Sequence, residues 1–235
     1  MGDVDQERAG AHEPQDLLGP LNDVERRFAP ARIWYQGRRE LLSSDPRIAV
    51  VGSRDLSPDG ARRAGDITRF LVENGVVVVS GLAAGADTIA HRTAIERRGR
   101  TIAVLGTPLQ TCYPAANREL QQKIGAEHLL LSQFAPGTPI QRGNFVIRNR
   151  LMALVADASI IVEAGDSSGT LSQGWEALRL GRQLFILEPV VDAPNLKWPA
   201  KMIEYGAVPL ALEDLGDLLE AVPPPGPRLH VDHSA

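Results

Sequence analysis

The chain has 235 residues, 43% of them apolar and 23% charged, so it is long enough for one well-cored domain and too apolar for a disordered protein. No apolar run reaches 18 residues, and the first residues are polar and acidic, which favours a cytoplasmic protein without a membrane span or secretory signal. The single cysteine, Cys112, excludes an internal disulfide and a cysteine-based zinc site, and the five histidines lack ligand-like spacing. We therefore expect neither a metal nor another cofactor.

The formal net charge of -4 is unevenly distributed along the chain. Residues 47–206 carry 18 basic and 15 acidic side chains, whereas both flanks are acidic. All but three of the 25 basic residues are arginine, which suits bidentate contacts with phosphate groups. Genomic base composition can produce the same bias, so arginine content leaves both interpretations open.

We expect a folded domain at residues 23–222, between a disordered lead-in at residues 1–22 and a Pro-rich disordered tail at residues 223–235. Short Val- and Ile-rich runs predict strands that are buried on both faces, at residues 48–51, 76–79, 101–105, 159–162 and 184–187. Segments of helical period separate them, at residues 58–74, 87–97, 117–124, 145–156 and 170–180. This alternation predicts an α/β fold with a doubly wound, mostly parallel, Rossmann-like sheet.

The loops after the strands are the candidate binding region, because ligands of such sheets bind beyond the carboxyl ends of the strands. Three of these loops contain glycine and lead into a helix, a combination that lets backbone N–H groups approach an anion. The first loop begins with Gly52-Ser53-Arg54. The candidate phosphate-binding residues of the other two are Ser80, Gly81, Gly85, Ser168, Gly169 and Thr170. Tight turns without a ligand would use the same glycines, and the first two loops lack the GxGxxG and Walker A patterns.

Two acids, Asp87 and Glu163, are expected beside these loops. Each could accept a hydrogen bond from a ribose hydroxyl, cap a helix or hold an arginine in place.

The densest polar segment is residues 142–150, where arginine and asparagine side chains surround Phe145. Such a segment could clamp phosphates and stack a base. Alternatively, one of its arginines caps the preceding strand or pairs with Glu163. The candidate residues here are Asn144, Arg148, Asn149 and Arg150.

In this order and spacing, the motifs resemble those of the DprA/Smf DNA-processing family. The resemblance runs from about residue 33 to residue 208. The motifs are Val50-Val51-Gly52-Ser53-Arg54, Ser80-Gly81-Leu82-Ala83 with Gly85, Asp87 and His91, residues 101–106, Tyr113-Pro114 with Asn117, Pro136-Gly137-Thr138, Asn144-Phe145, Arg148-Asn149-Arg150, Val162-Glu163-Ala164 and Ser168-Gly169.

The resemblance implies a Rossmann-like core that binds single-stranded DNA, forms a homodimer, protects incoming DNA and helps load a RecA-type recombinase in transformation or recombination. It implies no catalysis and no catalytic residue. It assigns DNA contacts to Arg54, Arg148 and Arg150, and places Ser80, Gly81, Gly85, Asp87, Ser168 and Gly169 near phosphates. The chain departs from the family pattern at Ala84, Ala115, Gln133, Val146 and Pro189. We expect it to be a core-only version of the family, without a winged helix.

The alternative function is a nucleotide-binding enzyme that resembles the lysine-decarboxylase-like phosphoribohydrolases. Their signature is a Gly-Gly-x-Gly-Thr turn followed closely by a catalytic glutamate. Here Ser168-Gly169-Thr170 keeps the end of that turn, and Glu176 follows six residues after Thr170. Because six residues fall short of two helical turns, Glu176 would not point at the same spot as the catalytic glutamate of that signature. The spacing favours the binding protein.

Overall fold

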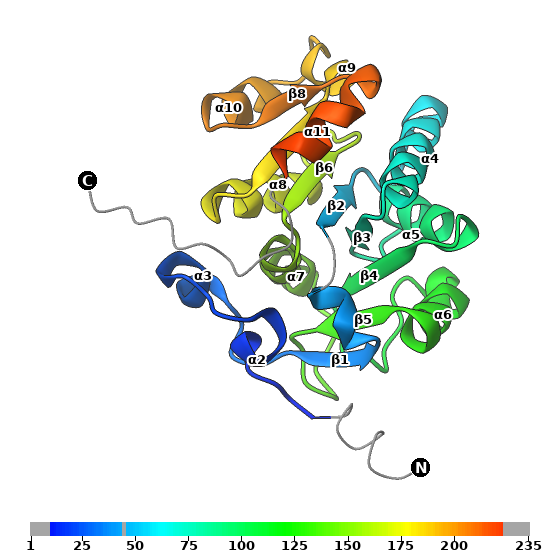
Figure 1. The fold of residues 1–235 in the computed structure, drawn as a ribbon, viewed down its shortest axis with the longest axis vertical. Helices are drawn as coiled ribbons and strands as arrows, with labels where there is room; N and C mark the ends of the chain where they lie inside the picture. The colour runs from blue at the N-terminus through cyan, green and yellow to red at the C-terminus, as the bar shows by residue number, and fades with distance from the viewer. Residues whose placement is uncertain (1–9, 44–45, 223–235) are drawn as a thin grey trace.

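The computed structural model describes residues 10–43 and 46–222. Its centre is an eight-stranded sheet in the order β1-β5-β4-β3-β2-β6-β7-β8 (Figure 1). Within the described residues, β1 is the strand that runs antiparallel to its neighbour, β5, and the other pairings are parallel. The strands are β1 (Trp34–Gly37), β2 (Arg47–Val51), β3 (Val77–Ser80), β4 (Arg100–Leu105), β5 (Leu129–Ser132), β6 (Ala158–Ile161), β7 (Gln183–Leu187) and β8 (Val208–Leu210).

The five predicted strands are confirmed as β2, β3, β4, β6 and β7, each within one residue of its expected bounds. Their sequences are apolar throughout because helices cover both faces of the sheet. β1, β5 and β8 were not predicted. Both β1 and β8 lie at the edges of the sheet, where Gly37 and Pro209 are tolerated although they obscure a strand pattern.

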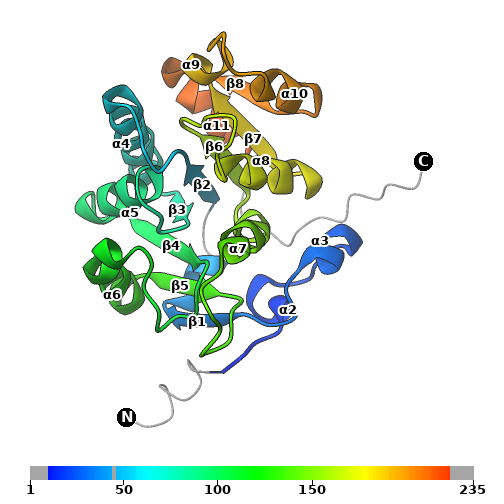
Figure 2. The same cartoon turned by 180° about the vertical axis from the view of Figure 1, so that it is seen from behind.

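Helices form a layer on each face of the sheet (Figures 1 and 2). One layer contains α4 (Pro58–Glu73), α5 (Ala86–Glu96), α6 (Arg118–Glu127) and α11 (Leu215–Ala221). The other contains α7 (Arg142–Val155), α8 (Thr170–Arg179) and α10 (Trp198–Glu204), with the short α2 (Pro14–Leu18) and α3 (Asp23–Phe28) beside them. The four-residue α9 (Glu188–Val191) follows β7, and the 3-10 turns are η1 (Arg39–Leu42), η2 (Ala115–Asn117) and η3 (Leu212–Asp214).

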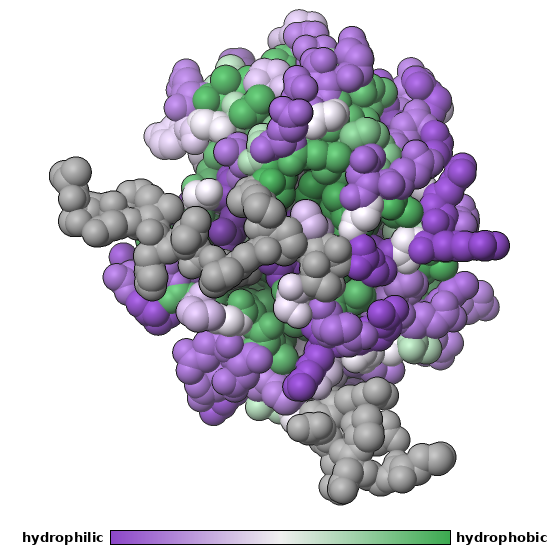
Figure 3. Space-filling model, viewed as in Figure 1, coloured by the Kyte–Doolittle hydropathy of each residue, from purple (hydrophilic) through white to green (hydrophobic). Residues whose placement is uncertain are grey.

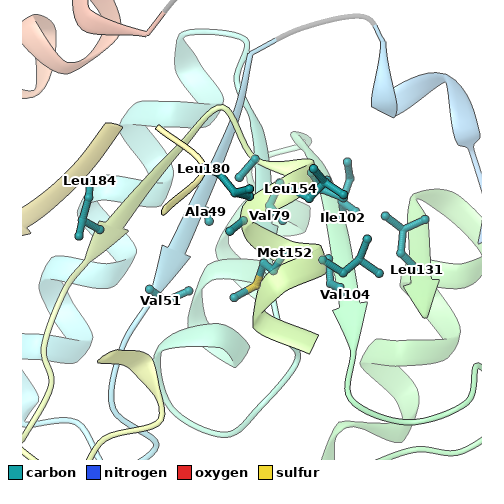
Figure 4. Close-up of a cluster of buried hydrophobic side chains, with 14 of the residues drawn as sticks. Ala49, Val51, Val79, Ile102, Val104, Leu131, Met152, Leu154, Leu180 and Leu184 are labelled. Carbon is teal, nitrogen blue, oxygen red and sulfur yellow. The ribbon is translucent and has the colours of Figure 1, made fainter. Parts of the chain in front are cut away.

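The core is divided by the sheet, because successive strand side chains point to opposite faces. In β2, Ala49 and Val51 pack on the α7 side, whereas Ile48 and Val50 pack on the α4 side. Figure 4 shows the α7 side, where residues of several strands surround Met152. All five residues of β2 are buried, which fixes the position of the loop that follows it.

The helix starts explain where the strand-end loops turn. Ser57 caps α4 by accepting a hydrogen bond from the Gly60 N–H, as its position before Pro58 predicts. α7 begins at Arg142, three residues before its predicted start, and its N-cap residue Gln141 makes no side-chain cap hydrogen bond. The missing cap signal accounts for the late prediction. As a result, the polar segment 142–150 is helical throughout.

The expected disordered lead-in is wrong for residues 10–22. Pro14–Leu18 forms a helix, and Leu18 and Leu21 are buried in the α7-side core. His12 also exchanges backbone hydrogen bonds with Ile33, which joins this segment to the entrance of β1. The apolar side chains are too widely spaced there to give a periodic signal. The remainder of the expected lead-in, residues 1–9, and the expected tail, residues 223–235, lie outside the described residues.

On the face shown in Figure 3, polar residues cover most of the surface and apolar residues appear mainly in its upper half. In the part of the chain that the structure describes, no helix is both long enough and apolar enough to cross a membrane.

Candidate nucleic-acid interface

The reversal of strand order lies between β2 and β6, which pair with each other in the middle of the sheet. From these two strands the chain continues in opposite directions, so the loops after them diverge. The space between the diverging loops is the favoured ligand position of a doubly wound sheet. We name the loops after their strands: the β2 loop is residues 52–57, the β3 loop residues 81–85 and the β6 loop residues 162–169.

Hydrogen bonds tie the three loops into one unit. The Ser53 N–H donates to the Glu163 carbonyl over 2.7 Å, and the Ala86 N–H donates to the Ser53 carbonyl over 3.2 Å. The Thr170 hydroxyl donates to the Gly52 carbonyl over 2.9 Å. The sequence expectation that these loops converge on one edge is therefore confirmed.

Two glycines are required by close approach. A Cβ on Gly81 would lie 1.8 Å from Nη1 of Arg148, so a side chain there would displace the guanidinium. Gly85 has a φ of +74°, and a Cβ on it would lie 2.3 Å from the Ser53 carbonyl oxygen. By contrast, a Cβ on Gly165 or Gly169 would meet nothing within 4 Å, so the β6 loop faces open space.

Arg148 lies beneath these loops rather than on the surface. It is 5% exposed, and its Nη1 donates to the carbonyls of Gly81 and Val104, the latter over 2.7 Å. Its Nε donates to Oδ1 of Asn149 over 3.0 Å. The alternative of an arginine that caps a strand fits Arg148, because Val104 belongs to β4. A direct phosphate contact would require Arg148 to leave these carbonyls.

Arg148 interacts electrostatically with Asp87, which is also buried and accepts a hydrogen bond from the Ala83 N–H over 3.2 Å. Burial raises the pKa of the Asp87 carboxyl, and the charge of Arg148 opposes that rise. Burial likewise lowers the pKa of Arg148, and Asp87 opposes that change. Each group therefore stabilises the charge of the other inside the fold.

Asn149 connects α7 to the β6 loop by hydrogen bonds of its side chain. Its Nδ2 donates to the Gly169 carbonyl over 3.1 Å and to Oγ of Ser172 over 3.2 Å. Together, Arg148 and Asn149 contact the ends of β3 and β4 and the start of α8. Two adjacent residues of α7 thus hold the loops in place.

Three other predicted polar residues make hydrogen bonds within the fold. Asn144 is buried and donates to the Pro139 carbonyl over 3.0 Å. Glu163 accepts from the N–H and hydroxyl of Ser57, so it caps the start of α4. Ser80 is buried and its hydroxyl donates to the Val50 carbonyl over 2.7 Å. Glu163 therefore caps a helix, and Asn144 and Ser80 hold backbone carbonyls within the fold.

Arg150 lies farther along α7, where its Nε is 3.2 Å from Oε1 of Glu176. Its side chain is 45% exposed, whereas that of Glu176 is 8% exposed. Arg179 approaches the same carboxylate oxygen at 3.5 Å. Glu176 is therefore directed at α7 and not at the β6 loop, as its spacing from Thr170 predicts.

An aromatic and cationic cluster is formed by one residue each from the β2 loop, the loop after β4 and α7, and of the three only Phe145 is half-buried. The guanidinium carbon of Arg54 lies 5.5 Å from the centroid of the Phe145 ring, and Arg54 is exposed. The Tyr113 ring lies 5.3 Å from the Phe145 ring at an interplanar angle of 47°, and Tyr113 is 46% exposed. We name Arg54, Tyr113 and Phe145 the aromatic cluster. Of the predicted contact residues, it includes Arg54 alone.

Sequence reasoning noted Phe145 as the aromatic of the 142–150 segment but assigned no contact to Tyr113. Tyr113 lies in the loop between β4 and η2, which has no periodicity to position it. Gly106, in the same loop, lets the Phe145 ring approach, because a Cβ there would lie 2.5 Å from that ring. Among the described residues, no three His, Cys, Asp or Glu side chains group so that they could hold a metal ion.

Comparison with known proteins places this arrangement in a family. A DNA processing protein DprA of Streptococcus pneumoniae is 43% identical over 159 residues, which cover 68% of this chain and 56% of that protein. The X-ray structure of DprA from Streptococcus pneumoniae matches with a TM-score of 0.76 at 32% identity, over 95% of this chain and 79% of that one. A structure of DprA from Helicobacter pylori, described for its single-stranded DNA binding mode, matches with a TM-score of 0.75 at 25% identity, over 91% of this chain and 97% of that one.

The chain spans between half and two thirds of the length of the curated relatives it matches first. Residues 20–223 match the family described as DNA recombination-mediator protein A, and this match covers most of the chain. The TM-scores of these two solved structures show that they share the overall fold of this chain. The chain therefore belongs to the DprA/Smf family of DNA processing proteins.

Proposed function

We propose that the chain binds single-stranded DNA across the carboxyl edge of its sheet, with the aromatic cluster as the central contact. The observation that carries the proposal is the exposed Arg54 guanidinium over the Phe145 ring, with the exposed Tyr113 ring beside it. Unpaired bases stack on aromatic side chains, and a nearby cation attracts the phosphate backbone. Duplex DNA offers no free base faces to such a cluster.

The backbone of the loops supplies the second part of the proposed interface. Arg148 and Asn149 hold the β3 and β6 loops through hydrogen bonds to backbone carbonyls, and at the start of α8 Gly169 is exposed and Ser168 half-buried. In the first turn of α8, the Thr170 N–H donates to the Ser168 hydroxyl and the Leu171 N–H to the Ser168 carbonyl, each over 3.2 Å. A helix N-terminus suits a phosphate oxygen, which in this proposal would replace these long hydrogen bonds. In this proposal Ser80, Gly81 and Gly85 shape the edge, and Arg54 and Arg150 contribute surface charge.

We also propose a cellular role, which is based on the family to which the chain belongs. The chain would act in the cytoplasm, protect incoming single-stranded DNA and help load a RecA-type recombinase in transformation or recombination. A homodimer with two-fold symmetry would place two such edges on one strand and raise the effective affinity. Sedimentation at tens of micromolar protein would test this assembly, and monomers alone would contradict it.

The proposed protein is a binder and not an enzyme. Hydrolysis of an N-glycosidic bond needs a carboxylate near the ribose. Glu163 is engaged in capping α4, and Glu176 pairs with Arg150. We expect no base release from ribonucleoside monophosphates above a heat-treated control. Release that is lost in Glu163→Gln or Glu176→Gln, with an intact fold, would favour the phosphoribohydrolase alternative.

The test of the main proposal is fluorescence anisotropy with a labelled oligonucleotide, competed by unlabelled single strands, duplex and free nucleotides. We expect single strands to compete best, with binding that weakens as salt rises by a slope of about -0.7 per neutralised phosphate. Binding that is unaffected by salt, or that is abolished equally well by a mononucleotide, would contradict the proposal.

A further inference from the structure

A pocket lies on the carboxyl side of the sheet, lined by residues of α4, the start of α9 and the segment after β8. Its volume is about 180 Å³. Pockets for drug-sized ligands have roughly 300 to 1,000 Å³, so this one suits a single planar ring. Apolar lining comes from Leu187, Pro189, Leu210 and Leu212.

Arg63, which lines this pocket, has a hydrogen-bond donor without a partner. The side chain of Arg63 is 16% exposed, and its Nη2 lies 3.8 Å from Oε2 of Glu163, which is too long for a hydrogen bond. Its Nε is buried and has no hydrogen-bond partner. A buried donor of this kind is unfavourable until an acceptor reaches it. The neighbouring Arg62 is already engaged, because its Nη2 is 2.9 Å from Asp59.

Hydrogen-bond acceptors face the same pocket. Glu188 and Glu213 line it, and both are exposed. Neither has an ion-pair partner in the described part of the chain. The pocket therefore combines a free donor with free carboxylate acceptors above an apolar lining.

This combination selects the class of ligand by charge. A phosphate group would be repelled by the two carboxylates, and an ammonium or guanidinium group by the two arginines. A neutral ring that both donates and accepts hydrogen bonds fits both sets. Nucleobases with an exocyclic amine have this character: arginine donates to base acceptors, and glutamate accepts from the cytosine N4 amine.

The pocket is linked to the proposed interface through Glu163. Its side chain lies beside Arg63, and its carbonyl accepts from the Ser53 N–H next to Arg54. A strand that lies on the β2 and β6 loops would therefore pass close to the pocket. We propose that the pocket takes one base of the bound strand and prefers a base with an exocyclic amine, such as cytosine, over thymine. This inference rests on the proposed single-stranded DNA binding.

The test compares labelled dC12 and dT12 by fluorescence anisotropy, because cytosine and thymine have the same ring size and opposite hydrogen-bonding edges. We expect dC12 to bind about fivefold more tightly or better, the lower end for one specific side-chain contact with a base. The double variant Glu188→Gln and Glu213→Gln should lose this preference and keep its affinity for dT12. Glu96→Gln, at an exposed position on α5, is the matched control and should keep the preference. Arg63→Lys, which keeps the charge but lacks the Nε donor, should also reduce the preference.

The outcomes separate this inference from the function it rests on. If neither oligonucleotide binds, the proposed function fails and the pocket assignment fails with it. If both bind equally, or the preference survives in the double variant, the pocket assignment alone is overturned. The protein could instead bind dC12 and dT12 with equal affinity and also bind a lysine-rich peptide in a manner that depends on Glu213. That result would show that the pocket takes a cationic side chain and would overturn the assignment.

Discussion

The guanidinium of Arg54 lies 5.5 Å from the ring centroid of Phe145, across the space between the β2 loop and α7. The two residues are 91 positions apart in the chain, so the fold creates this pair. An arginine above an aromatic ring gains cation–π stabilisation, and the same two groups suit a phosphate and a base. The pair therefore allows the charge and stacking contributions to DNA binding to be measured separately.

The stacking contribution is measured with Phe145→Leu. Loss of one stacked base is expected to weaken binding of single-stranded DNA by about 1–3 kcal/mol, which is roughly five- to 150-fold. The salt dependence should stay the same, because no charge is removed. Val146→Ala is the matched control, since Val146 is the next residue of α7 and is 50% exposed. Equal affinities for Phe145→Leu and the control would contradict the stacking role.

The charge contribution is measured with Arg54→Gln. We expect the slope of log affinity against log salt to become shallower by about 0.7, as for one lost phosphate contact. Arg150→Gln should change it less, because Arg150 is already paired with Glu176. The matched control is Arg97→Gln, because Arg97 is an exposed arginine at the C-terminal end of α5. An unchanged slope for Arg54→Gln would remove Arg54 from the interface.

The sequence predicted the sheet better than the chemistry of its edge. Val- and Ile-rich runs identify β2, β3, β4, β6 and β7 because burial on both faces leaves a continuous apolar signal. Edge strands such as β8 carry no such signal. The resemblance to the family placed the loops correctly along the chain, but residue type alone could not separate an exposed arginine from a buried one.

Arg148 illustrates that limit. The sequence assigned it a DNA contact on the same grounds as Arg54, yet it is 5% exposed and donates to two backbone carbonyls. Only the packing of α7 against β4 decides between the two roles. Conversely, the capping role of Glu163 was among the open alternatives, because this acid was expected beside loops that lead into helices.

Arg148→Met is expected to destabilise the fold by about 3–5 kcal/mol, because it leaves the Asp87 carboxyl buried without its compensating charge. Asp87→Asn combined with Arg148→Met should cost less than the two single variants added together. Urea denaturation followed by circular dichroism gives the free energies of unfolding. Additive losses would show that the two groups are not coupled, and a stability like that of the native chain would place Arg148 outside the core.

Asn149→Ala should loosen the β6 loop while leaving the sheet intact. The variant removes the hydrogen bonds to the Gly169 carbonyl and the Ser172 hydroxyl, so the start of α8 loses its connection to α7. We expect faster hydrogen exchange at residues 165–170 and weaker binding of single-stranded DNA. Asn144→Ala, which releases the Pro139 carbonyl instead, is the matched control and should leave exchange in the β6 loop unchanged. Unaltered exchange in Asn149→Ala would contradict the bracing role.

The last prediction concerns acid, and it depends on His91 under the β3 loop. His91 is fully buried, and its Nδ1 lies 2.7 Å from the Thr101 hydroxyl oxygen. The Thr101 hydroxyl donates to the Val78 carbonyl, so it accepts from His91, which fixes the neutral Nδ1–H form of the ring. Burial, with the nearby charge of Arg148, lowers the pKa of His91 from 6.5 to about 3.

A lowered histidine pKa means that the unfolded chain binds the proton more readily than the folded one. The stability that His91 contributes is therefore complete above about pH 6.5 and is lost as the pH falls toward 3, with a slope of up to about 1.4 kcal/mol per pH unit. Between pH 6.5 and pH 5, above the ordinary carboxyl range, we expect the free energy of unfolding to fall. His91→Gln should flatten that part of the profile. His128→Gln is a useful comparison, because burial also lowers the pKa of His128, and it should remove a smaller part of the slope. Parallel profiles for the native chain and His91→Gln in urea denaturation would show that His91 is protonated equally well in both states.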